Sequence, residues 1–205
     1  MARVSELRRL PGCVRVCFDD GAAVDVPTPL FQLRRVRAGD DVDRERWRAE
    51  WQAQAYPFAL ERAAGLLGVR DASEQETADR LRRSGYPEET VARVMQTLTQ
   101  AGYVDDGRFA EHFVESRGRR YGSRRLYGEL RRKGVSDETA REALEELSPE
   151  DEAASARRQA EKLLARKDAA DPDVQRKAVQ ALVRRGYGWD TAREAVEAAA
   201  GTSNE

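Results

Sequence analysis

The densest group of side chains suited to binding a charged partner lies at residues 117 to 133. The stretch holds eight cations and one anion, Glu129, and so carries a net charge of +7. Arginine and lysine bind phosphates, and tyrosine rings stack on nucleic-acid bases. The stretch therefore predicts a contact surface for a polyanion. Its candidate contact residues are Arg117, Arg119, Arg120, Tyr121, Arg124, Arg125, Tyr127, Arg131, Arg132 and Lys133.

The same charges permit two other interpretations. The stretch could dock on an acidic protein surface, or it could be a solvated helix face that the acidic segment 138–146 compensates. The whole chain has 36 Lys plus Arg against 37 Asp plus Glu and a net charge of −1, so any binding of nucleic acid must be local. Nearly all the cations are arginines. This excess suits bidentate contacts, and a GC-rich coding bias would also produce it.

The sequence offers no catalytic constellation. Its single histidine, His112, cannot supply a Ser-His-Asp relay or a histidine metal cluster, and we expect a packing or surface role for it. The GRRYG segment 118–122 lacks the Gly-Lys-Ser/Thr ending of a phosphate-binding loop. Cys13 and Cys17, four residues apart in a predicted strand, favour two free thiols. We therefore predict a non-enzymatic protein without catalytic residues, metal or cofactor.

The helices that position the charged stretch belong to a repeated pattern. The sequence contains three ungapped copies of it, at residues 78–98, 127–147 and 179–199. A period of roughly 50 residues is typical of stacked helical units that bury their apolar faces against one another. Each copy predicts a helix that ends at a left-handed glycine, followed by a helix with a buried apolar stripe. The three glycines are Gly85, Gly134 and Gly186.

We predict a mainly α fold: an elongated tandem array of three three-helix repeats with a small N-terminal extension that contains a β-hairpin. The strand-rich extension and its linking helix are expected at 1–56, the repeats at 57–104, 105–149 and 150–201, and a disordered tail at 202–205.

Alternating apolar residues on both sides of Gly21 predict the hairpin, and residues 4–10 could add a third strand. A short helix closed by Gly39 should follow, and the acidic run 40–43 should begin the next helix. In the first repeat, Ser73 with Glu76 three residues later forms the sequence pattern of a capping box, which predicts a helix start. The first helix of that repeat is expected from about residue 58.

A second motif joins the first two repeats: Tyr103, Asp105, Asp106, Arg108 and Phe109. An aspartate can cap the following helix, the two aromatic rings can pack together, and the arginine can pair with a capping carboxylate. By the same contacts the junction would set the angle between the repeats.

The motifs together resemble the RecX family of recombination regulators. The resemblance covers residues 58–199 and rests on the junction GYVDDxRFA and two further patterns. These are Arg117, Gly122, Leu126, Leu130, Lys133 and Gly134 in the basic stretch, and Leu182, Arg185, Gly186 and Tyr187 near the end. The resemblance implies a cytoplasmic, non-enzymatic modulator that binds along the groove of the RecA filament and suppresses ATP hydrolysis, strand exchange and co-protease activity, or promotes disassembly. It also implies that DNA can be bound directly, and it places the contact surface at Arg117, Arg124, Arg125, Arg131, Arg132 and Lys133.

Two rival functions remain at this stage. A DNA-binding protein could use the third helix of each repeat as a reader, although in the second repeat this helix carries four glutamates against Arg141. A scaffold without nucleic acid would leave the +7 stretch unexplained. The expected partners are the RecA filament and, weakly and locally, single- or double-stranded DNA. No apolar run approaches the ~18 to 20 residues that span a bilayer, so we expect no membrane contact, and we expect a monomer.

Overall fold

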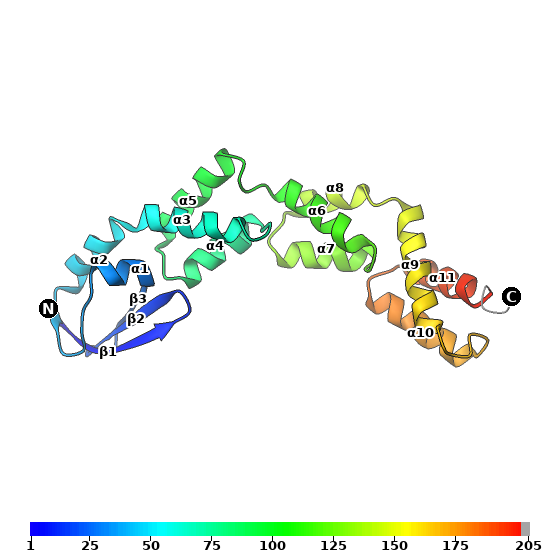
Figure 1. Ribbon diagram of the computed structural model, residues 1–205, viewed down its shortest axis with the longest axis horizontal. Coiled ribbons are helices and arrows are strands. Elements are labelled where there is room, and N and C mark those ends of the chain that lie inside the picture. The colour runs from blue at the N-terminus through cyan, green and yellow to red at the C-terminus, as the bar shows by residue number, and fades with distance from the viewer. Residues whose placement is uncertain (202–205) are drawn as a thin grey trace. The chain divides into compact units, whose positions relative to one another are not determined.

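The computed structural model describes residues 1–201, which form a four-stranded sheet and eleven helices (Figure 1). The segment 202–205, where a disordered tail is expected, lies outside the described residues. The chain divides into two compact units, Met1–Asp105 and Asp106–Glu205. The prediction of a mainly α fold with a small strand-containing N-terminal region is confirmed.

The antiparallel sheet has the strand order β3-β2-β1-β4. Its strands are β1 (Ala2–Leu10), β2 (Cys13–Phe18), β3 (Ala23–Pro27) and β4 (Asp41–Val42). The predicted hairpin is confirmed: β2 pairs with β3, and Gly21 has φ +80° in the turn between them. The predicted third strand is also confirmed, because β1 pairs with β2. The fourth strand was not expected, because two residues are too few to show a pattern.

Of the two predicted helix boundaries after the hairpin, the helix end at Gly39 is wrong, and the helix start at the acidic run holds only for the last residue of the run, Asp43. Helix α1 (Thr28–Leu33) ends well before Gly39, whose N–H donates to the Val4 carbonyl at 2.8 Å. The acidic run does not begin a helix as a whole, because Asp41 lies in β4. Pairing with β1 uses this backbone, so helix α2 (Arg44–Gln52) starts only after it.

Asp43 alone caps α2, and Trp47 and Trp51 of this helix are both buried, on the shared face that their spacing predicts.

The first repeat consists of α3 (Ala55–Leu67), α4 (Glu74–Arg83) and α5 (Glu88–Gln100). Helix α3 starts three residues earlier than expected, because Pro57 is tolerated in the first turn of a helix. A single core cluster extends from the sheet through all three helices. The N-terminal extension and the first repeat therefore share one core.

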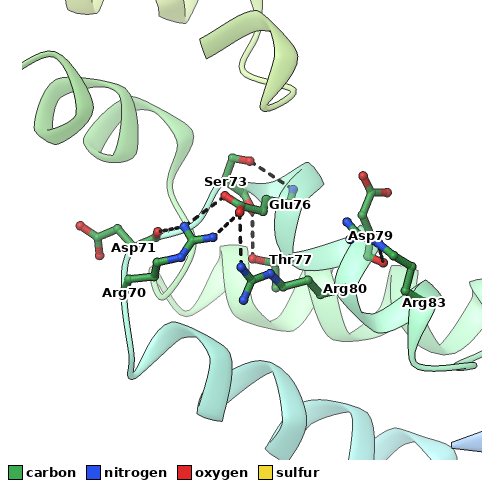
Figure 2. Close-up of polar contacts among 8 residues, drawn as sticks. All are labelled: Arg70, Asp71, Ser73, Glu76, Thr77, Asp79, Arg80 and Arg83. Atoms are coloured by element: carbon green, nitrogen blue, oxygen red, sulfur yellow. Dashed lines mark hydrogen bonds and ion pairs between the residues drawn. The ribbon is translucent and has the colours of Figure 1, made fainter. Parts of the chain in front are cut away.

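The predicted start of α4 at Ser73 is confirmed (Figure 2). The Ser73 side chain accepts a hydrogen bond from the backbone N–H of Glu76 at 3.1 Å. The Glu76 carboxylate in turn pairs with Arg70 and, at 3.5 Å, with Arg80. These contacts fix the first turn of the helix next to the preceding loop.

The second unit contains the other two repeats. The second repeat consists of α6 (Asp106–Gly118), α7 (Ser123–Arg132) and α8 (Asp137–Glu145). The third consists of α9 (Pro149–Leu164), α10 (Pro172–Arg184) and α11 (Trp189–Gly201). The predicted left-handed glycines are confirmed, with φ +84°, +87° and +93° at Gly85, Gly134 and Gly186. The third helices bury their apolar stripes, as expected.

Candidate functional site

The ten predicted contact residues all lie in the second repeat, in one continuous run. They occupy the end of α6, the loop that follows it, α7, and the residue that caps α7 (Figure 1). Six are exposed: Arg117, Arg119, Arg120, Arg124, Arg131 and Arg132. Four are half-buried: Tyr121, Arg125, Tyr127 and Lys133.

Glu129 offsets two of the arginines. Its carboxylate accepts hydrogen bonds from Nη1 of Arg117 and from Nε of Arg125, both at 2.9 Å. The Glu129 side chain is only 11% exposed, while the two arginines remain 45% and 40% exposed. Packing of α6 against α7 thus places the one anion of the stretch between two of its cations, and their charge is locally compensated.

Both tyrosines of the stretch have intramolecular partners. The guanidinium of Arg125 lies 4.1 Å from the centre of the Tyr121 ring, so it occupies one face of that ring. The Tyr127 hydroxyl donates a hydrogen bond to the Asp137 carboxylate at the start of α8. Within the second repeat, these two side chains tie α7 to its neighbours.

The cations at the end of α7 also contact their own repeat. Arg131 donates to the backbone carbonyl four residues later, and Arg132 donates to the carbonyl four residues earlier at 3.2 Å. The Lys133 ammonium lies 5.7 and 5.9 Å from the ring centres of Phe109 and Phe113. Cations are favourable at this position, because the carbonyl end of a helix carries a partial negative charge.

The remaining three arginines, Arg119, Arg120 and Arg124, are exposed, and within residues 1–201 their side chains take part in no hydrogen bond or ion pair. They lie in the loop after α6 and at the first turn of α7. Arg131 and Arg132, whose hydrogen bonds go to backbone carbonyls, form no ion pair within these residues either, so arginines without an acidic partner lie at both ends of α7.

The junction residues lie where the two units of the chain meet in sequence. Tyr103 is 68% exposed, Asp105 and Arg108 are exposed, and Asp106 is the first residue of α6. Phe109 is buried in the core of the second repeat, 6.0 Å from the Phe113 ring. The effect of the junction on the angle between repeats stays a prediction.

Two glycines connect the second and third repeats through their backbones. The Gly122 N–H donates to the Arg185 carbonyl at 3.0 Å, and the Arg124 N–H donates to the Gly186 carbonyl at 3.3 Å. A Cβ on Gly122 would lie 2.4 Å from the Gly186 carbonyl, and a Cβ on Gly186 would lie 2.4 Å from the Arg125 Cβ. Neither position has room for a side chain.

Helix α9 adds polar contacts to this joint. Ser155 is buried; its hydroxyl lies 2.8 Å from the Gly118 carbonyl and 2.8 Å from the Tyr187 hydroxyl. Gln159 donates to the Arg119 carbonyl at 3.2 Å. The sequence did not single out Ser155 or Gln159, because a polar residue on an amphipathic helix gives no sign that it will be buried by the next repeat.

An open groove of about 870 Å³ runs beside this joint, between α6 and α9. His112 lies along it, together with the apolar Val114 and Leu147. Its charged lining residues are Arg119, Arg120, Arg158 and Lys162 on the positive side and Glu111, Glu115, Glu146 and Asp151 on the negative side. The two signs balance, so the groove itself does not favour a polyanion.

Among residues 1–201, no three His, Cys, Asp or Glu side chains are grouped to hold a metal ion. Cys13 and Cys17 are free thiols, as predicted, and burial raises the pKa of Cys13. None of the described helices is both long and apolar enough to span a bilayer.

The three repeats match family models. The first, second and third three-helix domains of RecX correspond to residues 59–98, 105–144 and 150–196. A relative named regulatory protein RecX, from Prosthecochloris aestuarii, is 37% identical over 141 residues, which are 68% of this chain and 91% of the relative. The chain belongs to the RecX family. Its members among the curated relatives carry the name regulatory protein, which agrees with the resemblance found in the motifs.

Other RecX proteins match more of the chain. Regulatory protein RecX from Mycobacterium sp. strain KMS is 37% identical over 172 residues, covering 78% of this chain and 87% of the relative. A crystal structure of regulatory protein RecX has a TM-score of 0.63 at 23% identity and covers 93% of this chain and 97% of its own. The structure of RecX from Lactobacillus salivarius has a TM-score of 0.64 at 21% identity and covers 72% and 97%. These two structures share the fold.

Proposed function

We propose that the protein is a non-enzymatic regulator of homologous recombination and DNA repair that binds the RecA nucleoprotein filament. Binding would inhibit the ATPase, strand-exchange and co-protease activities of the filament. Membership of the RecX family of regulatory proteins carries this proposal. The protein would act in the cytoplasm as a monomer. Its proposed domains are the N-terminal extension at 1–56 and the three repeats at 57–104, 105–149 and 150–201.

The surface that we propose for filament contact centres on Arg119, Arg120 and Arg124. These side chains are exposed, and within residues 1–201 none of them forms an ion pair. Each contact with the filament could be weak, because several linked repeats that bind one polymer raise the effective concentration of one another. The mechanism is then steric and electrostatic, and it needs no deep pocket or bound cofactor.

The alternative function is direct DNA binding without RecA contact, and the same three arginines favour it. Use of the third helices as readers is opposed by the acidic first turn of α8, which begins with Asp137 and Glu138 and would be repelled by phosphates. Direct binding would instead involve the loop before α7.

Co-sedimentation with preformed RecA filaments at two salt concentrations tests the proposal. The triple variant Arg119→Ala, Arg120→Ala and Arg124→Ala should lose filament binding. The matched control replaces Arg157, Arg176 and Arg193, which are exposed but paired with neighbouring carboxylates on their own helices. The control should bind like the wild type. Absence of wild-type binding to filaments, together with binding to naked DNA, would leave the alternative.

A further inference from the structure

The groove between α6 and α9 separates its charges along its length. Two hydrogen bonds set the direction in which the two segments pass each other. The Ser155 hydroxyl donates to the Gly118 carbonyl at 2.8 Å, and Gln159, one turn later on α9, donates to the Arg119 carbonyl at 3.2 Å. Both segments therefore advance in the same direction at this crossing. Residues before it share one end of the groove, and residues after it share the other end.

The acidic lining residues all lie before the crossing. Glu111 and Glu115 stand about two turns and about one turn before Gly118, on one face of α6. Glu146 ends α8, and Asp151 lies in the first turn of α9. All four carboxylates are exposed. They give the groove an acidic end.

The cationic lining residues all lie after the crossing. Arg119 and Arg120 directly follow α6, and Arg158 and Lys162 stand about one turn and about two turns after Ser155 on α9. These four side chains are also exposed. They give the groove a basic end.

The eight charges of this groove do not pair with one another. Within residues 1–201 none of them forms an ion pair, although both signs line the same space. Just outside the groove, Arg157 pairs with Glu161 on the same helix at 3.5 Å. Unpaired charges of opposite sign at two ends produce an electric field along the groove. The apolar side chains of Val114 and Leu147 also line it.

We propose that this groove binds a short segment of a partner protein, in which cations at one end and carboxylates at the other flank an apolar side chain. The cations of the segment would meet the acidic end, and its carboxylates would meet the arginines and the lysine of the basic end, where charge-assisted hydrogen bonds can form. A nucleic acid fits poorly, because the acidic end would repel its phosphates. The volume of about 870 Å³ is open enough to admit such a segment.

This inference goes beyond the proposed function, because it assigns a second surface to a protein segment of mixed charge. Arg119 and Arg120 belong both to this groove and to the surface proposed for filament contact. The variants that test the groove therefore leave these two residues unchanged, and the probe is a peptide in the absence of RecA.

The probe is the labelled peptide Lys-Lys-Lys-Ala-Leu-Ala-Glu-Glu-Glu, whose charges are segregated. The control peptide, Lys-Glu-Lys-Ala-Leu-Ala-Glu-Lys-Glu, has the same composition and net charge with the signs mixed. Fluorescence anisotropy with the full chain should show at least about tenfold tighter binding of the segregated peptide. Higher salt should weaken this binding, because the contacts are exposed.

Reversal of the acidic end tests the assignment of the groove. The double variant Glu111→Lys and Glu115→Lys should bind the segregated peptide about tenfold more weakly, and it should bind an oligothymidine more tightly than the wild type does. The matched control is Glu138→Lys with Glu142→Lys. These two glutamates have the same spacing on α8, are exposed, form no ion pair within residues 1–201, and lie outside the groove. The control should keep the wild-type affinity for the peptide.

Reversal of the basic end is the complementary test. The double variant Arg158→Glu and Lys162→Glu should also weaken binding of the segregated peptide, by about tenfold. Circular dichroism and urea midpoints show whether each variant is folded, so a loss of binding can be separated from a loss of structure.

Three results would overturn the inference. One is absence of binding of the segregated peptide, or equal binding of the two peptides. Another is an equal loss of affinity in the groove variant Glu111→Lys, Glu115→Lys and in its control on α8. The third is displacement of the peptide from the wild type by oligothymidine at lower concentration than unlabelled peptide, which would assign the groove to nucleic acid. Suppression of RecA filament hydrolysis without peptide binding would contradict this inference alone.

Discussion

The backbones of Gly122 and Gly186 are in direct contact, and there is no room for a Cβ atom between them. A Cβ atom on Gly122 would lie 2.4 Å from the carbonyl carbon of Gly186. Gly122 has an ordinary φ of −79°, so space alone requires a glycine there. Gly186 has φ +93° and is constrained by both conformation and space. The second and third repeats are therefore joined at a fixed backbone spacing, which also sets the distance between Arg124 and the end of α10.

Gly122→Ala should destabilise the unit formed by the second and third repeats. The new methyl group cannot be accommodated unless the two backbones move apart, and overpacking of this kind costs about 1 to 3 kcal/mol. Urea unfolding followed by circular dichroism measures the loss. Gly128→Ala, within the helix α7 that Gly122 precedes, is the control, because no atom lies within 4 Å of its Cβ position; it should be neutral or slightly stabilising. Equal midpoints for the two variants would contradict this account of the joint.

Ser155→Ala should destabilise the same joint by a different route. Its buried hydroxyl is hydrogen-bonded to the Gly118 carbonyl and the Tyr187 hydroxyl, so its removal leaves buried polar groups without a partner. Such a loss costs about 1 to 3 kcal/mol. A double-mutant cycle with Tyr187→Phe should give a coupling free energy of at least about 0.5 kcal/mol in urea unfolding. Strict additivity would show that the two hydroxyls do not interact.

Arg124 and Arg125 are adjacent in sequence but should respond differently to replacement by alanine. Arg125 pairs with Glu129 and covers Tyr121, so Arg125→Ala should lower stability, by no more than about 1 kcal/mol for a partly exposed pair. Arg124→Ala should leave stability unchanged and weaken binding to RecA filaments. Urea midpoints and co-sedimentation, measured on both variants, check the contrast. The reverse pattern would mean that compensation by Glu129 does not decide which arginine is available.

Alkaline pH should destabilise the first unit through Tyr86. Burial raises the pKa of Tyr86 from its ordinary value of 10.0 to about 12. The unfolded chain therefore loses this proton at lower pH than the folded chain, and the stability that the neutral phenol provides is lost as the pH rises from about 10 through about 12.

Thermal unfolding at about pH 9 and about pH 11 checks this prediction. In a Trp189→Phe background, the remaining fluorescence comes from Trp47 and Trp51, which lie in the first unit. Tyr86→Phe should show a smaller fall in melting temperature between the two pH values. An identical fall with and without the hydroxyl would assign the effect to other groups.

Much of the fold could be predicted from sequence because its signals are local. Ser73 caps α4 within three residues, and the left-handed Gly85 ends the same helix. The strand β4 and the true end of α1 could not be predicted in this way. They depend on pairing between Ala2 and Val42, forty residues apart, and a two-residue strand carries no alternating pattern of its own.

The candidate site shows the same division. The sequence revealed the excess of positive charge. The compensation of Arg117 by Glu129 could not be predicted, because these residues are twelve positions apart and meet only when their two helices pack together.

We propose above all that this member of the RecX family regulates the RecA filament. DNA-dependent ATP hydrolysis by preformed RecA filaments, measured while the protein is added below stoichiometry, tests it most directly. The account predicts suppression of hydrolysis at substoichiometric amounts, and weaker suppression by the Arg119→Ala, Arg120→Ala, Arg124→Ala variant. Unchanged hydrolysis, with no protein co-sedimenting on the filaments, would contradict it.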